Sequence, residues 1–113
     1  MSVRTILAQT ATATVMEDTL NAAGPSDPVR VRDNIAIQFT GPATAITAVV
    51  ERSTMDPSLG AANWCRVEDT AITGNPASGM TVMAYSEPAI AWWRVRLIGL
   101  TGSNVTVSIS GSV

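Results

Sequence analysis

The chain has 113 residues, of which 46% are hydrophobic and 14% charged, and its formal net charge is -2. This length and apolar content predict one folded domain and exclude a disordered chain. All 7 basic residues are arginines, and there is neither lysine nor histidine. These absences exclude a Ser-His-Asp or Cys-His nucleophile, a histidine metal site, a Schiff-base lysine and a lysine-containing phosphate loop.

The net charge and the cysteine content exclude further classes of function. A nearly neutral, slightly acidic domain is poorly suited to the phosphate backbone of a nucleic acid. Cys65 is the sole cysteine, so neither an internal disulfide nor a cysteine zinc site is expected. The apolar stretches are too short for a signal peptide or a spanning helix, which predicts synthesis in the cytoplasm and no membrane contact. We therefore predict a protein that is not an enzyme, with no metal and no cofactor.

Residues 1–28 form a leader of different character from the rest. It is rich in Ala and Thr, and near its end Gly24, Pro25 and Pro28 prevent a continuous regular element. Residues 11–16 are compatible with a strand, and a helix over 4–20 is the rival interpretation. We favour an extended N-terminal arm with one strand, able to pair with its own sheet or with a neighbour's sheet edge.

Residues 29–113 have the pattern of a β domain. Period-two alternation at 29–32 is interrupted by Asp33 and Asn34 and resumes at 35–39. Short strands separated by turn residues predict an all-β fold, an antiparallel β-sandwich of jelly-roll-like type in a single domain. The further strands are expected at 45–52, 64–68, 81–85, 92–98 and 105–110, with turns or loops at 41–42, 55–60, 74–79 and 101–104.

Alternation also assigns side chains to the two faces of each strand. In the strand 92–98, we place Trp93, Val95 and Leu97 in the core. The opposite face carries Trp92, Arg94, Arg96 and Ile98, where guanidinium groups can stack on an indole or pair with Glu51, Glu68 or Asp69.

The remaining core predictions concern the strands 45–52 and 64–68. Trp64 is expected to fill the core together with Trp93, because large aromatic side chains dominate packing. Cys65 is predicted to be a small buried or half-buried apolar residue. In the first of these strands we place Ile46, Ala48 and Val50 inside.

Paired carboxylates are the one candidate for catalysis, since two of them can act as acid and base in glycosidases. The sequence favours simpler roles. Glu51 and Glu68 lie in strands with arginines and suit ion pairs across a sheet, and Asp56 precedes Pro57 in a turn. Trp92 is the aromatic residue best placed for an exposed contact, because Trp and Arg are enriched at interfaces.

A series of elements in the body matches a known group of proteins. The strand Thr47–Ser53 is followed by Asp56 and Trp64, and a Glu87-Pro88 turn leads to the strand residues 93–96. A turn at 101–103 then leads into 105–108. Residues 35–113 in this respect resemble small bacteriophage virion proteins, most closely head decoration (cement) proteins. Trp93, where Tyr is commoner, and the long loop 55–63 depart from the pattern.

The resemblance implies a β-sandwich that serves as a building block of a virus particle. Decoration proteins of this size sit on the outside of the capsid, often as trimers, and bridge neighbouring capsomers. The first hypothesis is thus a non-enzymatic capsid decoration protein on the virion surface, with the major capsid protein and its own copies in a homotrimer as partners. The residues predicted to make capsid or subunit contacts are Arg4, Ile6, Leu7 and Val15 in the leader and Trp92, Arg94 and Arg96 in the body.

Two other classes remain open at this point. The same group includes tail, fibre and baseplate modules, which would make this chain a module for host or carbohydrate recognition. A small carboxylate enzyme is the third reading, and the missing histidine and lysine make it the least favoured.

Overall fold

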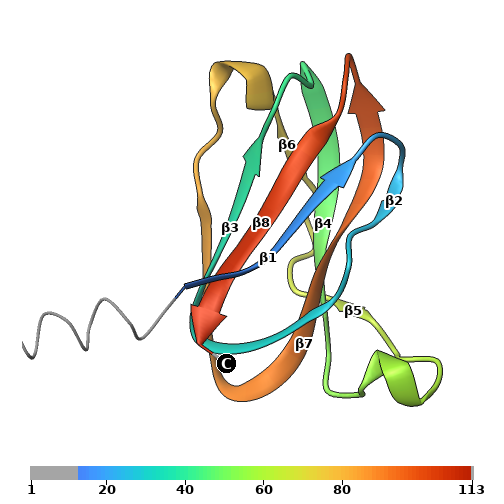
Figure 1. The fold of residues 1–113 in the computed structure, drawn as a ribbon, viewed down its shortest axis with the longest axis vertical. Helices are drawn as coiled ribbons and strands as arrows, with labels where there is room; N and C mark the ends of the chain where they lie inside the picture. Colours follow the sequence, from blue (N-terminus) through green and yellow to red (C-terminus); the bar gives the residue numbers. More distant parts are fainter. Residues whose placement is uncertain (1–12, 113) are drawn as a thin grey trace, which may run out of the picture.

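Residues 13–112, the part of the chain that the computed structural model describes, form antiparallel strands joined by turns and short 3-10 helices (Figure 1). The prediction of an all-β antiparallel domain is confirmed. The elements are β1 (Ala13–Leu20), β2 (Gly24–Pro25), β3 (Val29–Thr40), β4 (Ala45–Ser53), η1 (Pro57–Leu59), β5 (Cys65–Arg66), β6 (Ile72–Gly74), η2 (Pro76–Ser78), β7 (Met83–Thr101) and β8 (Val105–Ser112).

The strands follow the order β1-β8-β3-β7-β4-β5, with β2 paired to β7 and β6 paired to β4. The sheet folds over on itself, so that β1, β8 and β3 form one layer and β4 with the second half of β7 forms the other (Figure 1). Apolar side chains fill the space between the layers. A sandwich of this kind buries one face of each strand and leaves the opposite face for polar contacts.

β7 joins the two layers, and it corrects the prediction of separate strands at 81–85 and 92–98. It is one strand of 19 residues that pairs first with β3 and then with β4. Val31 pairs with Ala91 while Asp33 pairs with Glu87, so β7 has extra residues at the bend. Such a bulge turns a strand without ending it, and it tolerates Pro88, which has no N–H to donate.

The core contains the side chains that alternation assigned to it. Trp93, Val95 and Leu97 are 1%, 0% and 1% exposed, as predicted. Ile46, Ala48 and Val50, also predicted to lie inside, are 3% or less exposed. Further buried residues come from β3 and β8, namely Val31, Ile35, Ile37, Phe39, Val105, Val107 and Ile109.

The described part of the leader belongs to the sheet. β1 pairs with β8 from Ala13 opposite Gly111 to Leu20 opposite Val105, so it lies against the chain's own sheet. Residues 13–20 are therefore strand, and the rival helix is absent from them. β2 continues the attachment through Gly24 opposite Leu97.

The segment 64–68 departs from the prediction. Only Cys65 and Arg66 form a strand, at the edge of the sheet next to β4. Cys65 is exposed, so the expectation of a buried or half-buried cysteine was wrong. The reason is that a two-residue edge strand has no second layer to cover its side chains. Residues 13–112 contain no helix of the length and apolarity that crossing a membrane requires.

Candidate functional site

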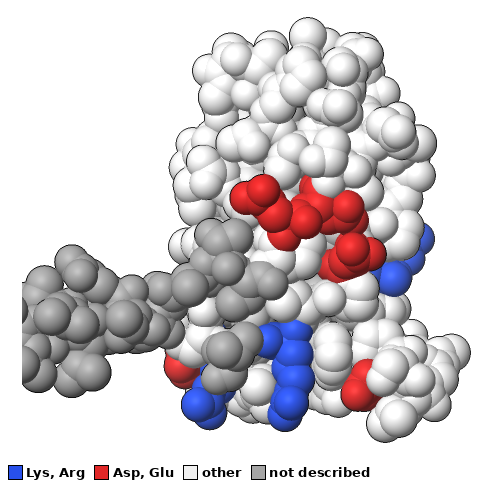
Figure 2. Space-filling view, viewed as in Figure 1, with Lys and Arg blue, Asp and Glu red and all other residues white. Residues whose placement is uncertain are grey.

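Charged side chains are unevenly distributed over the molecule. On the face drawn in Figure 2, acidic side chains gather near the middle, over β1 and the segment after β2, and the upper part carries no charged residue. Asp18 and Asp27 belong to these segments, and the Asp27 N–H donates to the Asp18 carboxylate at 3.0 Å. The charged side chains visible on this face therefore lie in its middle and lower parts.

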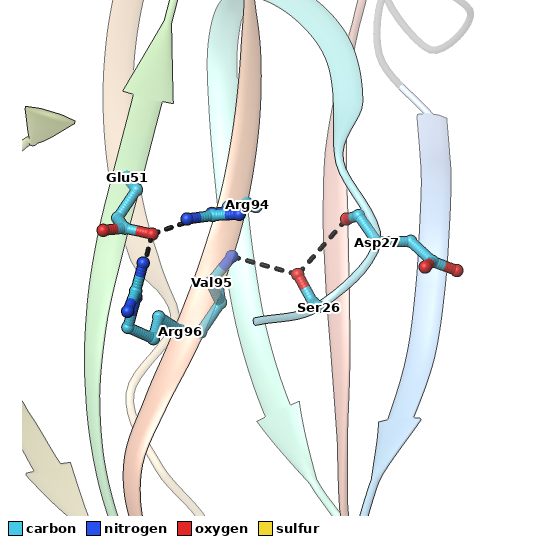
Figure 3. A network of polar contacts seen from close by, with 6 residues as sticks. All are labelled: Ser26, Asp27, Glu51, Arg94, Val95 and Arg96. Atoms are coloured by element: carbon cyan, nitrogen blue, oxygen red, sulfur yellow. Dashed lines mark hydrogen bonds and ion pairs between the residues drawn. The ribbon is translucent and has the colours of Figure 1, made fainter. Parts of the chain in front are cut away.

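The outer face of β4 and β7 carries a network centred on Glu51 (Figure 3). Glu51 lies directly opposite Arg94 in the strand register, and only 6% of it is exposed. Its Oε1 accepts from Arg94 Nε at 2.8 Å and from Arg96 Nε at 3.2 Å. Opposite charges facing each other across strands stabilise a sheet, and charge-assisted bonds are the stronger kind. Of the three acids predicted as possible partners, Glu51, Glu68 and Asp69, Glu51 is thus the one that binds both arginines.

Trp64 covers this network, which corrects its predicted place in the core. The centre of the Arg94 guanidinium lies 4.2 Å from the centroid of the Trp64 ring. Trp64 is half-buried on the outer face because β5 pairs with the edge of β4, beside Glu51. The predicted stacking of guanidinium on indole is thus present, with Trp64 as the ring. The stack shields Arg94, whose side chain is 15% exposed.

Ser26 fastens the leader to β7 (Figure 3). The Ser26 N–H donates to the Val95 carbonyl at 2.7 Å, and the Val95 N–H donates to Ser26 Oγ at 3.0 Å. Ser26 is 4% exposed, so these bonds are protected from water. Together with β1 they fix residues 13–28 on the body.

A hollow of about 320 Å³ lies around Trp92. Trp92 is half-buried, and the hollow's wall includes Asp56 from the loop after β4 and Ile90 from the bend of β7. An aromatic ring beside an arginine and an aliphatic side chain is the composition found at protein interfaces. We define the Trp92 surface as this hollow together with the tip of the loop beside it, that is Arg30, Thr54, Asp56, Leu59, Ile90 and Trp92.

The loop between β4 and β5 projects from the lower end of the molecule (Figure 1). Asp56 caps its 3-10 turn, accepting from the Ser58 N–H at 2.9 Å and from Ser58 Oγ at 2.7 Å. The hydrogen bonds from Ser58, the side-chain one first, lower the pKa of Asp56. Leu59 follows at the tip and is 85% exposed. A fixed turn thus holds an apolar side chain in water, in the same loop as Asp56, which lines the hollow.

Leu59 is an exposed apolar residue that the sequence alone did not single out. The residues Asp56-Pro57-Ser58 were a usable signal, because an Asp that caps a turn predicts a rigid loop. Alternation gives no direction for a side chain outside a strand, and so the exposure of Leu59 had to come from the structure. Trp92 is half-buried and lines the hollow together with residues of other segments, and its predicted role in a contact stays a prediction.

The other predicted contact residues have different fates. Arg4, Ile6 and Leu7 lie outside the described residues. Val15 lies in β1 at a register shift between Thr14 and Met16. Arg94 and Arg96 both pair with Glu51 of the same chain, and of the two only Arg96 is well exposed, at 46% of its side chain.

Comparisons with known proteins add no relative. No family model, no curated protein and no solved structure matches this chain. Among residues 13–112, no three His, Cys, Asp or Glu side chains come together in a group able to hold a metal ion. The function of the protein therefore has to be inferred from its own surface.

Proposed function

We propose that this protein is a non-enzymatic structural protein of a virion, a capsid decoration (cement) protein that binds the outside of a bacteriophage head. It would stabilise the contacts between capsomers, with the major capsid protein and its own copies, as a homotrimer, for partners. The observation that carries the proposal is the Trp92 surface, where a capped loop presents Leu59, 85% exposed, next to a hollow lined by Trp92.

The features of this surface suit binding to another protein. A side chain that already projects from a fixed turn loses little conformational freedom on binding, which favours affinity. Aromatic and arginine side chains beside it supply the groups in which interface energy concentrates. The resemblance of residues 35–113 to virion proteins points to a capsid as the partner.

Repetition would make a modest contact effective. A decoration protein binds many equivalent sites, and linked copies in a trimer bind with greater avidity than one copy. Binding to the assembled lattice alone stabilises that lattice by mass action, in proportion to occupancy. A small surface of this kind would then be sufficient to oppose the internal pressure of packaged DNA.

The test is binding to particles of the phage that encodes the chain, prepared without this protein. We expect purified protein to co-sediment with these particles, to appear as density on the head in cryo-electron microscopy and to raise the temperature of DNA release. Light scattering of the purified protein, without particles, should give the mass of a trimer. No density on the head at saturating protein would refute the decoration role.

Matched variants locate the contact. Leu59→Ser should reduce binding by about tenfold, the effect of losing one buried aliphatic anchor. Ile98→Ser is the control, because Ile98 is also an exposed aliphatic residue, at 54%, and lies outside the Trp92 surface. If the two variants bound the particles equally well, Leu59 would not be part of the interface.

A further inference from the structure

A second pocket, separate from the Trp92 surface, opens between β5 and the first part of β7. Its volume is about 330 Å³, within the range of small-molecule sites. It lies beside β5, the edge strand next to β4. The residues that line it are Arg52, Cys65, Arg66, Val67, Tyr85, Ser86, Glu87 and Trp93.

Three of its residues, Arg52, Tyr85 and Trp93, carry buried polar atoms with no hydrogen bond, and of these Arg52 is ion-paired with Glu87. Trp93 is 1% exposed, and its Nε1 has no hydrogen-bond acceptor among the described residues. The hydroxyl of Tyr85 is likewise enclosed, and the Glu68 carboxylate lies near it. Buried polar groups in native proteins are nearly always paired, so the unpaired N–H of Trp93 needs an explanation. The rings of Trp93 and Tyr85 lie next to each other, with centroids 5.6 Å apart.

The charged groups of the pocket come in both signs. Arg52 pairs with Glu87 across its wall, and Arg66 donates to the Asp69 carbonyl at 3.0 Å. Burial, and then the nearby Glu68 carboxylate, raises the pKa of Tyr85, so that its hydroxyl stays protonated and able to donate. The pocket therefore offers donors and acceptors together, with two arginines and one glutamate in its wall.

We propose that this pocket binds a small neutral polyhydroxylated molecule, namely a single sugar residue. Sugar hydroxyls both donate and accept, which matches the indole N–H of Trp93, the Tyr85 hydroxyl and the Glu87 carboxylate. The apolar face of a sugar ring suits aromatic walls. An anion would face Glu87 and a cation would face the arginines. The proposal is independent of the capsid role.

The experiment follows the indole N–H signals of the three tryptophans by NMR during titration with sugars. Hexoses and N-acetylated hexosamines are added one at a time to roughly 100 mM, well above a millimolar dissociation constant. We expect a saturable shift of the Trp93 signal with at least one sugar. The Trp92 signal is the internal reference, because Trp92 does not line this pocket. Trp64→Phe and Trp92→Phe assign the signals.

Variants separate the pocket from other causes. Tyr85→Phe keeps the ring and removes the hydroxyl, and it should weaken binding by about fivefold, the effect of one hydrogen bond. Trp92→Phe should leave the affinity unchanged. A Trp93 signal that no sugar moves would overturn the proposal. A saturable shift caused by acetate in place of every sugar would overturn it too, since the occupant would then be an anion.

Discussion

The two ends of the sandwich are held together by different interactions. At the upper end, the turns at 41–44 and 101–104 and the helix η2 contain no charged residue. Backbone groups join them: the Ala43 N–H donates to Asn104, the Thr44 N–H to Thr101 and the Ala77 N–H to Ala43, each at 3.0 Å. Tight turns place these groups opposite each other without help from side chains.

The lower end contains irregular backbone and charged side chains. Here β3 has a bulge with Asp33 at a positive φ of 67°, and β7 bends around the end of the molecule. Arg52 on β4 pairs with Glu87 at this bend, and Glu51 pairs with Arg94 further along the same two strands. Ion pairs between side chains thus join β4 to β7 at the bend and in the regular stretch beyond it, whereas backbone bonds suffice where the strands turn tightly.

The largest effect that tests this comparison is expected from Glu51→Gln. It leaves the half-buried Arg94 without its carboxylate, and we expect a loss of about 3 kcal/mol in the free energy of unfolding. The value lies at the low end for such a pair because the Arg96 side chain is 46% exposed. Denaturant unfolding measures it.

The control is Glu17→Gln, because Glu17 is an exposed acid on β1. It should change the free energy of unfolding by no more than about 0.5 kcal/mol. If both variants lost the same amount, general charge and not the network at Glu51 would be responsible, and the distinction between the ends would fail.

Gly102→Ala tests the uncharged end. Gly102 has a φ of +95°, and a Cβ there would lie 2.8 Å from Thr44 Oγ1 and 3.0 Å from the Thr44 backbone nitrogen. Strain and this contact together should reduce the free energy of unfolding by about 2 kcal/mol. The loss should be the same in low and high salt, since no charge is involved.

Gly79 is the matched position for that substitution. Its φ of +92° is similar, but a Cβ there would meet nothing within 4 Å. Gly79→Ala should therefore show only the backbone strain, about 1 kcal/mol. A Gly102→Ala variant no less stable than Gly79→Ala would mean that the Thr44 turn moves freely, contrary to a rigid upper end.

Much of the fold could be predicted from the sequence because one face of each strand is buried. Alternation is sufficient to place Trp93, Val95 and Leu97 in the core, and all three are buried. It also places Arg94 on the face where Glu51 lies. These predictions need only local periodicity and the opposite signs of the charges.

Long-range neighbours could not be predicted in the same way. The continuity of β7 depends on its pairing with β3, and Trp64 lies outside the core because β5 is an edge strand. The Trp92 surface and the proposed sugar pocket each combine side chains from segments far apart in the chain. Alternation within one strand carries no information about which distant segments meet.

The smallest expected effect concerns the cap of the exposed loop at the charged end. The hydrogen bonds from Ser58 lower the pKa of Asp56 from its ordinary value of 3.8. Because the pKa is lowered in the folded state, the cap contributes its full stability above pH 3.8, the ordinary pKa. This contribution is lost as the pH falls through the lower, folded-state pKa. An NMR titration of the Asp56 carboxyl should thus give a midpoint below 3.8, and Ser58→Ala should move it back toward 3.8.

A midpoint that Ser58→Ala leaves in place would show that the cap does not fix the loop. Leu59 would then be presented by a loose segment, and the lower end would owe its order to the ion pairs of β4 and β7 alone.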